Sequence, residues 1–253
     1  MSKVGVPRLL RPPIGNIHIA QYMGSEYWRK VRSIRPANLI GYWPNWEPSG
    51  TDVNDYSGLG DRATSTGLGL AVAGADGVHQ TRAFNATPSH VNHLSAEFVT
   101  RFNPLELTIL GWAKVAAAGQ WTDGNIRQLV HIYTDDDNYT DIVKSVTNNR
   151  LIFSQCAGAT ERHVNVTDAT IGAAWFMYGL TISKSANQLK AFLKGAQAGV
   201  TQTVTGVYAG ALTAAFVGAY NNIATFPWLG YLDHYAVWNV ALSPSEVKQF
   251  SEV

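Results

Sequence analysis

The chain has 253 residues, 46% hydrophobic and 15% charged, so it can bury a substantial core in one large β domain or two small ones and is not disordered by composition. The formal net charge of +1 argues against a whole-protein affinity for nucleic acid. The single cysteine, Cys156, excludes a disulfide within the chain, and no apolar run is long enough to span a bilayer.

Residues 1–36 predict an extended, basic N-terminal arm. The opening MSKVGVPRLLRPPIG contains three prolines, which favour extended backbone, and lacks the unbroken apolar stretch of a signal peptide. We therefore expect synthesis in a cytoplasm, without a signal peptide. Because a free tail gains nothing from its apolar side chains, we expect the arm to dock on a partner or on the body. The residues assigned to this docking are Arg8, Leu9, Leu10, Arg11, Trp28, Arg29 and Arg32.

Residues 37–253 predict many short strands separated by turns rich in Gly, Asn, Asp and Pro. Leu107–Val115 is a clear strand, and RQLVHIY, TDIVKSV and RLIFSQCA form a three-strand meander by their spacing. QLKAFLKGAQAG reads as a strand with a turn at Lys194-Gly195. Regular short strands with turn signals indicate an all-β antiparallel sandwich or barrel.

The last predicted strand runs from Leu229 to Trp238 and carries an acid, Asp233, among apolar residues. Alternation predicts two faces, one with Tyr231, Asp233, Tyr235 and Val237, the other with Leu232, His234, Ala236 and Trp238. A short helix follows, with Ser243 as N-cap and Glu246 completing a capping box. We find no other sustained helical periodicity.

Several blocks of the chain resemble laminin-G-like, concanavalin A-like jelly-roll domains. LIGYWPNWEPSG followed by DYSGLGD resembles the family's first block, and GYLDHYAVWNVALSPSEV its last. LTILGWAKV, the Trp175 strand, LKG near Lys194 and FVGAY follow in the family's order, so the likeness covers residues 37–253. It implies two curved antiparallel sheets in a jelly-roll sandwich, with the first and last strands paired.

The resemblance also implies a structural calcium ion. In several relatives the acid on the last strand helps to bind Ca²⁺, so Asp233 would supply a carboxylate and the loop from Asp55 to Gly58 would supply carbonyls. Calcium takes several oxygen ligands, including backbone ones. The alternative is that Asp233 accepts a hydrogen bond from a loop N–H or a tyrosine hydroxyl and binds no metal.

The arm before a jelly roll is similar to laminin-G-like proteins of tailed bacteriophages, in which such domains serve as virion surface or decoration parts. This likeness implies a non-enzymatic virion protein, synthesised in the host cytoplasm, that docks on capsid subunits as a homo-oligomer or within the assembly. The alternative is a lectin-like, carbohydrate-binding module for a surface polysaccharide. We expect neither membrane insertion nor sequence-specific nucleic-acid binding.

Catalytic motifs are missing from the sequence. Glycosidases of this fold need two carboxylates on one strand face, but Glu-x-Asp-x-x-Glu and Glu-x-Asp-x-Glu are absent and the glutamates are scattered. A degenerate glycoside hydrolase is therefore the third hypothesis. The acidic stretch Asp135–Asn138 reads as a solvated hairpin turn or as a calcium loop at the sheet rim.

Aromatic and acidic residues in or near predicted loops are the candidate glycan site, because sugars stack on aromatic faces and are oriented by polar groups. A protein–protein contact explains the same aromatics equally well. The candidates are Trp46, Trp121, Asp135, Asp137, Asn138, Tyr139, Tyr220 and Trp228.

Overall fold

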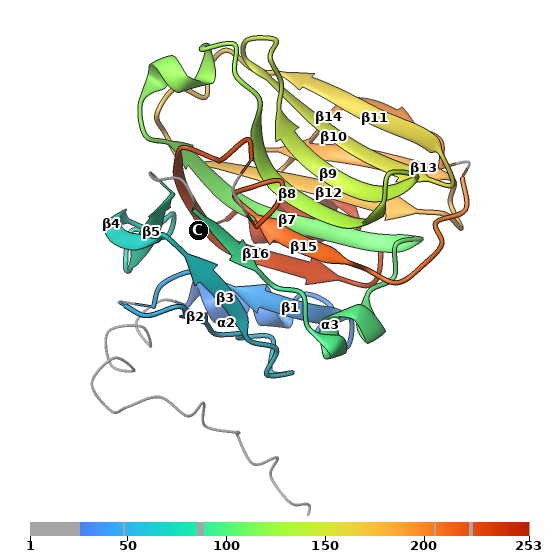
Figure 1. The fold of residues 1–253 in the computed structure, drawn as a ribbon, viewed down its shortest axis with the longest axis horizontal. Helices are drawn as coiled ribbons and strands as arrows, with labels where there is room; N and C mark the ends of the chain where they lie inside the picture. Colours follow the sequence, from blue (N-terminus) through green and yellow to red (C-terminus); the bar gives the residue numbers. More distant parts are fainter. Residues whose placement is uncertain (1–25, 48, 85–88, 205, 223–224, 253) are drawn as a thin grey trace, which may run out of the picture.

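The computed structural model describes residues 26–47, 49–84, 89–204, 206–222 and 225–252, and its strands form two antiparallel sheets packed face to face (Figure 1). The predicted all-β sandwich is confirmed. The first sheet has the order β14-β13-β12-β7-β16-β5-β4, with β1 also paired to β16. The second has the order β11-β10-β9-β8-β15-β6-β3-β2.

The strands of the first sheet are β1 (Leu39–Trp43), β4 (Gly69–Ala73), β5 (Gln80–Phe84), β7 (Glu106–Val115), β12 (Phe176–Ser183), β13 (Gln188–Leu193), β14 (Ala196–Gln202) and β16 (Gly230–Trp238). Those of the second are β2 (Asp52–Val53), β3 (Ala63–Thr66), β6 (His90–Asn92), β8 (Arg127–Asp135), β9 (Asn138–Lys144), β10 (Arg150–Ala157), β11 (Thr160–Thr167) and β15 (Ala214–Val217). Short helices are α2 (Tyr27–Ser33), α3 (Ala96–Arg101), the 3-10 turn η1 (Ala118–Trp121) and α4 (Pro244–Phe250).

The strand predictions agree with this architecture. The meander is β8-β9-β10, and the turn between β13 and β14 falls at Lys194 and Gly195, both of which have positive φ. A two-residue turn with that backbone matches the twist of a hairpin. The expected pairing of the first and last strands is present, with Leu39 opposite Trp238 in the β1–β16 ladder.

The main core lies between the two sheets and is built by alternate residues of each strand. On β7, Leu107, Ile109 and Ala113 face the second sheet, while Leu110 and Trp112 point to the outer face. The core residues of β7 are fully buried. Burial of apolar area at about 25 cal/mol per Å² is what holds two such sheets together without disulfides.

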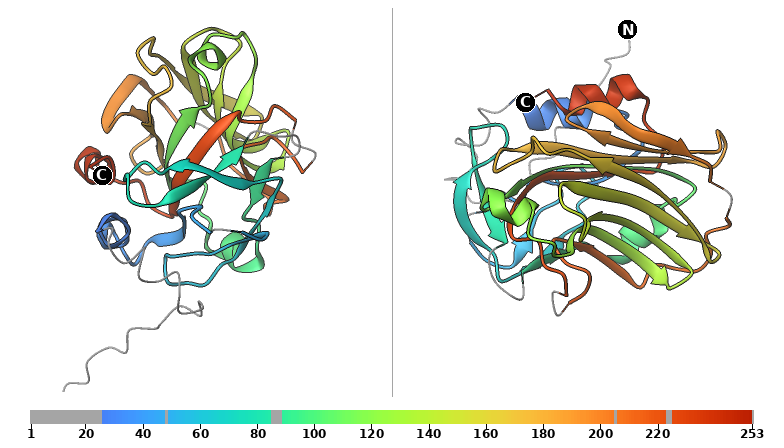
Figure 2. Two further views of the ribbon diagram at one scale, coloured as in Figure 1. Left: turned by 90° about the vertical axis from the view of Figure 1, so that its left-hand side faces the viewer. Right: turned by 90° about the horizontal axis from the view of Figure 1, so that it is seen from above.

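Helices α2 and α4 lie side by side on the outer face of the first sheet (Figure 2). The Tyr27 hydroxyl donates to the carbonyl of Phe250 and accepts from Trp112 Nε1 at 2.9 Å. Helix α4 begins as predicted, because Ser243 Oγ accepts from the Glu246 N–H and Glu246 Oε2 accepts from the Ser243 N–H. The predicted capping box is confirmed.

The predicted boundary between arm and body is wrong. Tyr27–Ser33 is a helix rather than extended arm, and its residues Tyr27 and Val31 are buried against the sheet together with the C-cap residue Ile34. Their spacing of four and then three residues puts them on one helical face. The indole of Trp238 donates to the Ile34 carbonyl at 2.7 Å and fixes the end of the helix.

Of the residues assigned to docking, only those on α2 can be placed. Trp28 is half-buried, and the guanidinium groups of Arg29 and Arg32 lie 5.4 and 5.6 Å from the centre of its ring. Trp28 packs against the buried side chains between α2, α4 and the first sheet, whereas Arg29 and Arg32 are exposed and contact Trp28 within the same helix. Arg8, Leu9, Leu10 and Arg11 lie outside the described residues.

A bulge in β16 breaks the predicted alternation. The register against β7 shifts between Asp233 and Ala236, and His234 has φ 48°. After the bulge, Tyr235 points into the core with Leu232, whereas Asp233 and His234 both point to the outer side. The prediction that Asp233 and Tyr235 share a face is wrong, because a bulge adds one residue and changes the phase of the strand.

Candidate functional site

All three of the predicted glycan-binding tryptophans are buried. Trp46 and Trp121 are 2% exposed and Trp228 is 0% exposed, so none of them offers a ring face to a ligand. Trp121 Nε1 donates to the Asp168 carbonyl and Trp228 Nε1 to the Lys114 carbonyl. The prediction fails because these loop aromatics turn inward and fill the core, where burying an aromatic ring gains most.

The acidic stretch is the turn between β8 and β9, as the hairpin interpretation predicts. Asp135 Oδ1 accepts from the Asp137 N–H at 3.0 Å and from Asn138 Nδ2 at 2.8 Å. Asn138 is buried and its Oδ1 accepts from the N–H groups of Gly158 and Ala209, so its role is to hold neighbouring loops. The carboxylates of Asp135 and Asp137 are exposed at the tip.

The remaining candidates, Tyr139 and Tyr220, do meet on one surface, the outer face of the second sheet. Tyr139 on β9 is directly opposite Tyr133 on β8 in the ladder. The Tyr133 ring stacks on His131 with centroids 5.2 Å apart, and the ring of Tyr220 lies 4.2 Å from His131. Each of the three tyrosines keeps part of its surface exposed. We call Tyr133, Tyr139, Tyr220, His131 and Asp141 the tyrosine face.

Polar contacts hold these rings in place. Asp141 Oδ1 lies 2.6 Å from His131 Nδ1 and accepts from Gln128 Nε2 at 3.1 Å. The Tyr133 hydroxyl donates to Asp136 at 2.8 Å, and this bond raises the pKa of Tyr133 to about 12. Tyr133 is therefore a neutral phenol at physiological pH, with its ring oriented by the hairpin turn.

Sequence reasoning missed His131, Tyr133 and Asp141. They lie in the predicted strands RQLVHIY and TDIVKSV, whereas the candidate glycan site was limited to residues in or near loops. The alternation of His131 and Tyr133 with the buried Val130 and Ile132 was the signal that could have placed them on the outer face.

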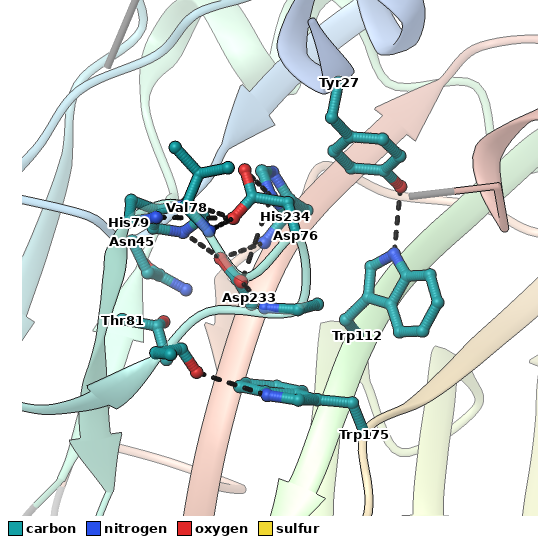
Figure 3. Close-up of polar contacts among 12 residues, drawn as sticks. Tyr27, Asn45, Asp76, Val78, His79, Thr81, Trp112, Trp175, Asp233 and His234 are labelled. Atoms are coloured by element: carbon teal, nitrogen blue, oxygen red, sulfur yellow. Dashed lines mark hydrogen bonds and ion pairs between the residues drawn. The ribbon is translucent and has the colours of Figure 1, made fainter. Parts of the chain in front are cut away.

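A second group lies in the first sheet, where the turn between β4 and β5 meets the bulge of β16 (Figure 3). We call Asp76, His79, Asp233 and His234 the Asp/His cluster. Their side chains are at most 3% exposed. His79 Nδ1 lies 2.8 Å from Asp76 Oδ1, and His79 Nε2 lies 3.1 Å from Asp233 Oδ1.

Electrostatics keep this cluster charged despite its burial. Burial raises the pKa of the Asp233 carboxyl, but the neighbouring His234 and His79 outweigh burial and lower it below its usual value. Burial lowers the pKa of His79, yet the two carboxylates raise it to about 10. Burial raises the pKa of the Asp76 carboxyl, but the neighbouring His234 and His79 outweigh burial and hold it well below its usual range.

The predicted calcium ligands do not fit a calcium ion. Asp233 Oδ2 accepts from the Ala75 N–H at 2.7 Å, which confirms that the acid binds a loop N–H. Asp55 belongs to a different set of contacts, in which its two oxygens accept from the N–H groups of Tyr42, Ser57, Gly60 and Asp61 and from the Ser57 hydroxyl. The Asp55 carboxylate thus orders its own loop, and Asp233 Oδ1 accepts from the His234 N–H at 3.0 Å, so the acid expected to bind Ca²⁺ is held by protein donors.

Gly58 weakens the calcium prediction further. A Cβ built there would lie 3.1 Å from Arg32 Nη2, so a guanidinium occupies the space beside the loop. A fixed cation next to the loop carbonyls repels a second cation.

Two thirds of the chain match a known protein family. Residues 80–248 match the model described as the concanavalin A-like lectin/glucanases superfamily. The chain belongs to this superfamily. The match runs from β5 into α4. It includes the whole tyrosine face and, of the Asp/His cluster, Asp233 and His234 but not Asp76 or His79. No curated protein matches the sequence.

Several solved structures that share this fold are domains described as binding domains or as bound to a ligand. Domain 4 of AbnA, a GH43 extracellular arabinanase from Geobacillus stearothermophilus, in complex with arabinotriose, aligns with TM-score 0.64 and 15% identity, covering 85% of this chain and 98% of that one. The botulinum neurotoxin serotype D binding domain aligns with TM-score 0.64 and 11% identity over 86% of this chain and 52% of that one.

The binding domain of Paraclostridial Mosquitocidal Protein 1 gives TM-score 0.64 and 15% identity over 85% of this chain and 52% of that one. The superfamily member described here therefore spans about half of each toxin domain. At these identities the likeness shows the fold alone. Within the described ranges, no helix is both long and apolar enough to cross a membrane.

Proposed function

We propose that the chain is a non-enzymatic carbohydrate-binding module and that its glycan lies on the tyrosine face. The observation that carries the proposal is the row of Tyr133, Tyr139 and Tyr220, partly exposed on neighbouring strands and held by hydrogen-bonded polar partners. The arabinotriose complex of a domain with the same fold supports it.

The chemistry of this face suits a sugar. An aromatic ring packs its apolar face against sugar C–H groups, while a hydroxyl, an imidazole and a carboxylate exchange hydrogen bonds with sugar hydroxyls. Here the rings are fixed before binding, because Tyr133 is bonded to Asp136 and His131 to Asp141. Preorganisation of this kind lowers the entropy cost of binding.

The other sheet is a poorer candidate. Its outer face is covered by α2 and α4, which bury Leu110, Trp112 and Trp238. The second sheet keeps the partly exposed tyrosines on its outer side, so the two faces of the sandwich differ in what they offer to a ligand.

We expect the tyrosine face to bind glycan without hydrolysing it. Glycoside hydrolysis needs two free carboxyl groups about 5–9.5 Å apart, one of them a proton donor. On the tyrosine face Asp141 is bound to His131 and Gln128, and Asp136 is bound to the Tyr133 hydroxyl. Both carboxylates are thus used to orient side chains.

The virion role remains a prediction. It depends on the docking arm, and the part of that arm outside the described residues carries Arg8 to Arg11. Sedimentation of source particles with the full chain, and with a variant lacking residues 1–25, tests it directly. Co-sedimentation of the full chain alone supports arm docking, and failure of both to co-sediment contradicts it.

A glycan array followed by calorimetry tests carbohydrate binding, with arabino-oligosaccharides among the ligands. We expect Tyr139→Ala and Tyr220→Ala each to weaken binding at least tenfold, about 1.4 kcal/mol. Tyr231→Ala is the matched control, because Tyr231 is a half-buried tyrosine on β16 whose ring lies under Lys114 in the first sheet. Full affinity in the first two variants, or no ligand on the array, overturns the proposal.

A further inference from the structure

The Asp/His cluster has two imidazole nitrogens that glycan binding does not explain. His234 is 0% exposed and its Nε2 makes no hydrogen bond. His79 Nδ1 is also buried without a hydrogen bond of normal geometry, although Asp76 Oδ1 lies 2.8 Å away. A buried polar atom without a partner destabilises the fold, so these two nitrogens call for an explanation.

The other nitrogen of each ring is held by a neighbour. His79 Nε2 lies 3.1 Å from Asp233 Oδ1, and His234 Nδ1 lies 2.6 Å from the Tyr42 hydroxyl. Histidines that bind metals in proteins show this pattern: one nitrogen faces the ion and the second donates to a carboxylate or another oxygen, which fixes the tautomer and the ring.

We propose that Asp76, His79 and His234 bind one divalent transition-metal ion, with zinc as the best match. One ligand atom from each residue lies within 4.8 Å of the others. Ligands about 2.0–2.1 Å from a tetrahedral zinc lie about 3.3–3.5 Å from one another. The separations from the two oxygens of Asp76 lie on either side of this value: His79 Nδ1 is 2.8 Å from Oδ1, and His234 Nε2 is 3.8 Å from Oδ2.

Charge balance favours a divalent ion. The cluster buries two carboxylates, Asp76 and Asp233, and a divalent cation with two neutral histidines makes the group electrically neutral. Asp233 then accepts from His79 Nε2–H, and Tyr42 accepts from His234 Nδ1–H. Two imidazole ligands favour zinc and related ions, whereas calcium and magnesium prefer oxygen.

The ion would join two parts of the first sheet. Asp76 and His79 come from the turn between β4 and β5, and His234 comes from the bulge of β16. Asp233 Oδ2 lies 3.9 Å from His234 Nε2 and is the next carboxylate oxygen to the group. The bulge of β16 is what makes this arrangement possible, because it turns the consecutive side chains of Asp233 and His234 to the same side of the sheet.

Metal titration of the full-length chain, prepared without a histidine tag and stripped with chelator, tests the proposal. We expect saturable binding of one Zn²⁺ or Co²⁺ per chain, a visible Co²⁺ spectrum of tetrahedral type, and a rise in melting temperature of about 5–10 °C at 100 times Kd. Ca²⁺ and Mg²⁺ should give no comparable rise. If no saturable binding is found, the proposal is wrong and the cluster is a metal-free set of ion pairs between histidine and aspartate.

Variants locate the ion. Asp76→Asn and His79→Gln should weaken Zn²⁺ binding more than about 100-fold, because loss of an outer partner alone costs about 10–100-fold. His90→Gln is the matched control, since His90 is a buried histidine on β6 outside the cluster. If Asp76→Asn and His79→Gln both bind Zn²⁺ like the parent chain, the ion lies elsewhere and the proposal is wrong.

Discussion

His93 should make the protein less stable as the pH falls. It follows β6, is 1% exposed, and packs among the rings of Trp43, Phe98 and Tyr235 with centroids 4.9–5.1 Å away. Burial lowers the pKa of His93 from 6.5 to about 3. The unfolded chain therefore binds a proton below pH 6.5 that the folded chain refuses until pH 3.

The magnitude follows from linkage. Between pH 6.5 and 3 the unfolded state holds more protons, so the free energy of unfolding falls as pH falls. At 1.36 kcal/mol per pKa unit, burial of His93 lowers the free energy of unfolding by about 2 kcal/mol at pH 5 and by about 5 kcal/mol near pH 2. Above about pH 7.5 this loss vanishes, because the His93 imidazole is neutral in both the folded and the unfolded chain.

Urea unfolding of the parent chain and of His93→Gln at pH 7.5 and pH 5 measures this contribution. The glutamine does not titrate, so the variant should lose about 2 kcal/mol less stability between the two pH values. His163→Gln is the control, because it removes a histidine whose side chain is 49% exposed. Equal pH dependence in the parent chain and His93→Gln would refute the reasoning.

Three further predictions concern stability, each checked by urea unfolding. Asp123→Ala should lower the free energy of unfolding by about 3–5 kcal/mol, because it removes the carboxylate that lies 2.9 Å from the fully buried Lys144 ammonium. The control Asp137→Ala, at the exposed hairpin tip, should change it by less than about 0.5 kcal/mol. Ser243→Ala should cost about 1 kcal/mol by removing the N-cap of α4, and unchanged stability would contradict the role of the capping box. Gly195→Ala should destabilise the β13–β14 hairpin by more than about 1 kcal/mol, because its φ is +80° and the new Cβ would meet Ser251 Oγ at 2.1 Å; a neutral result would show that the turn can change its backbone.

The strands and α4 were predictable because their signals are local. Alternating burial in β9 and the Ser243–Glu246 capping box each depend on residues a few positions apart. Helix α2 was missed because seven residues give only two turns of periodicity. Its apolar face exists to cover Trp112 and Trp238, which lie far away in the sequence.

The candidate sites were predictable only in part. Tyr139 and Tyr220 were found because loop and hairpin signals are local, but which way a loop tryptophan turns depends on the core that it fills, as Trp121 and Trp228 show. Asp233 was recognised as unusual, yet its partners Asp76 and His79 are about 155 residues away and meet it through the pairing of β16 with β5. No local pattern predicts the bulge that turns His234 to the same side.

The placement of α2 beside α4 decides how the module can be joined to anything else. Lys30 Nζ donates to the carbonyl of Glu252, so the two ends of the described fold meet on the outer face of the first sheet. The tyrosine face is on the opposite side of the sandwich. A linker or partner domain joined directly at residue 26 or residue 252 would start from the side opposite the tyrosine face. A short peptide connecting α2 to α4 would allow the chain to be opened at another loop while both sheets keep their pairing.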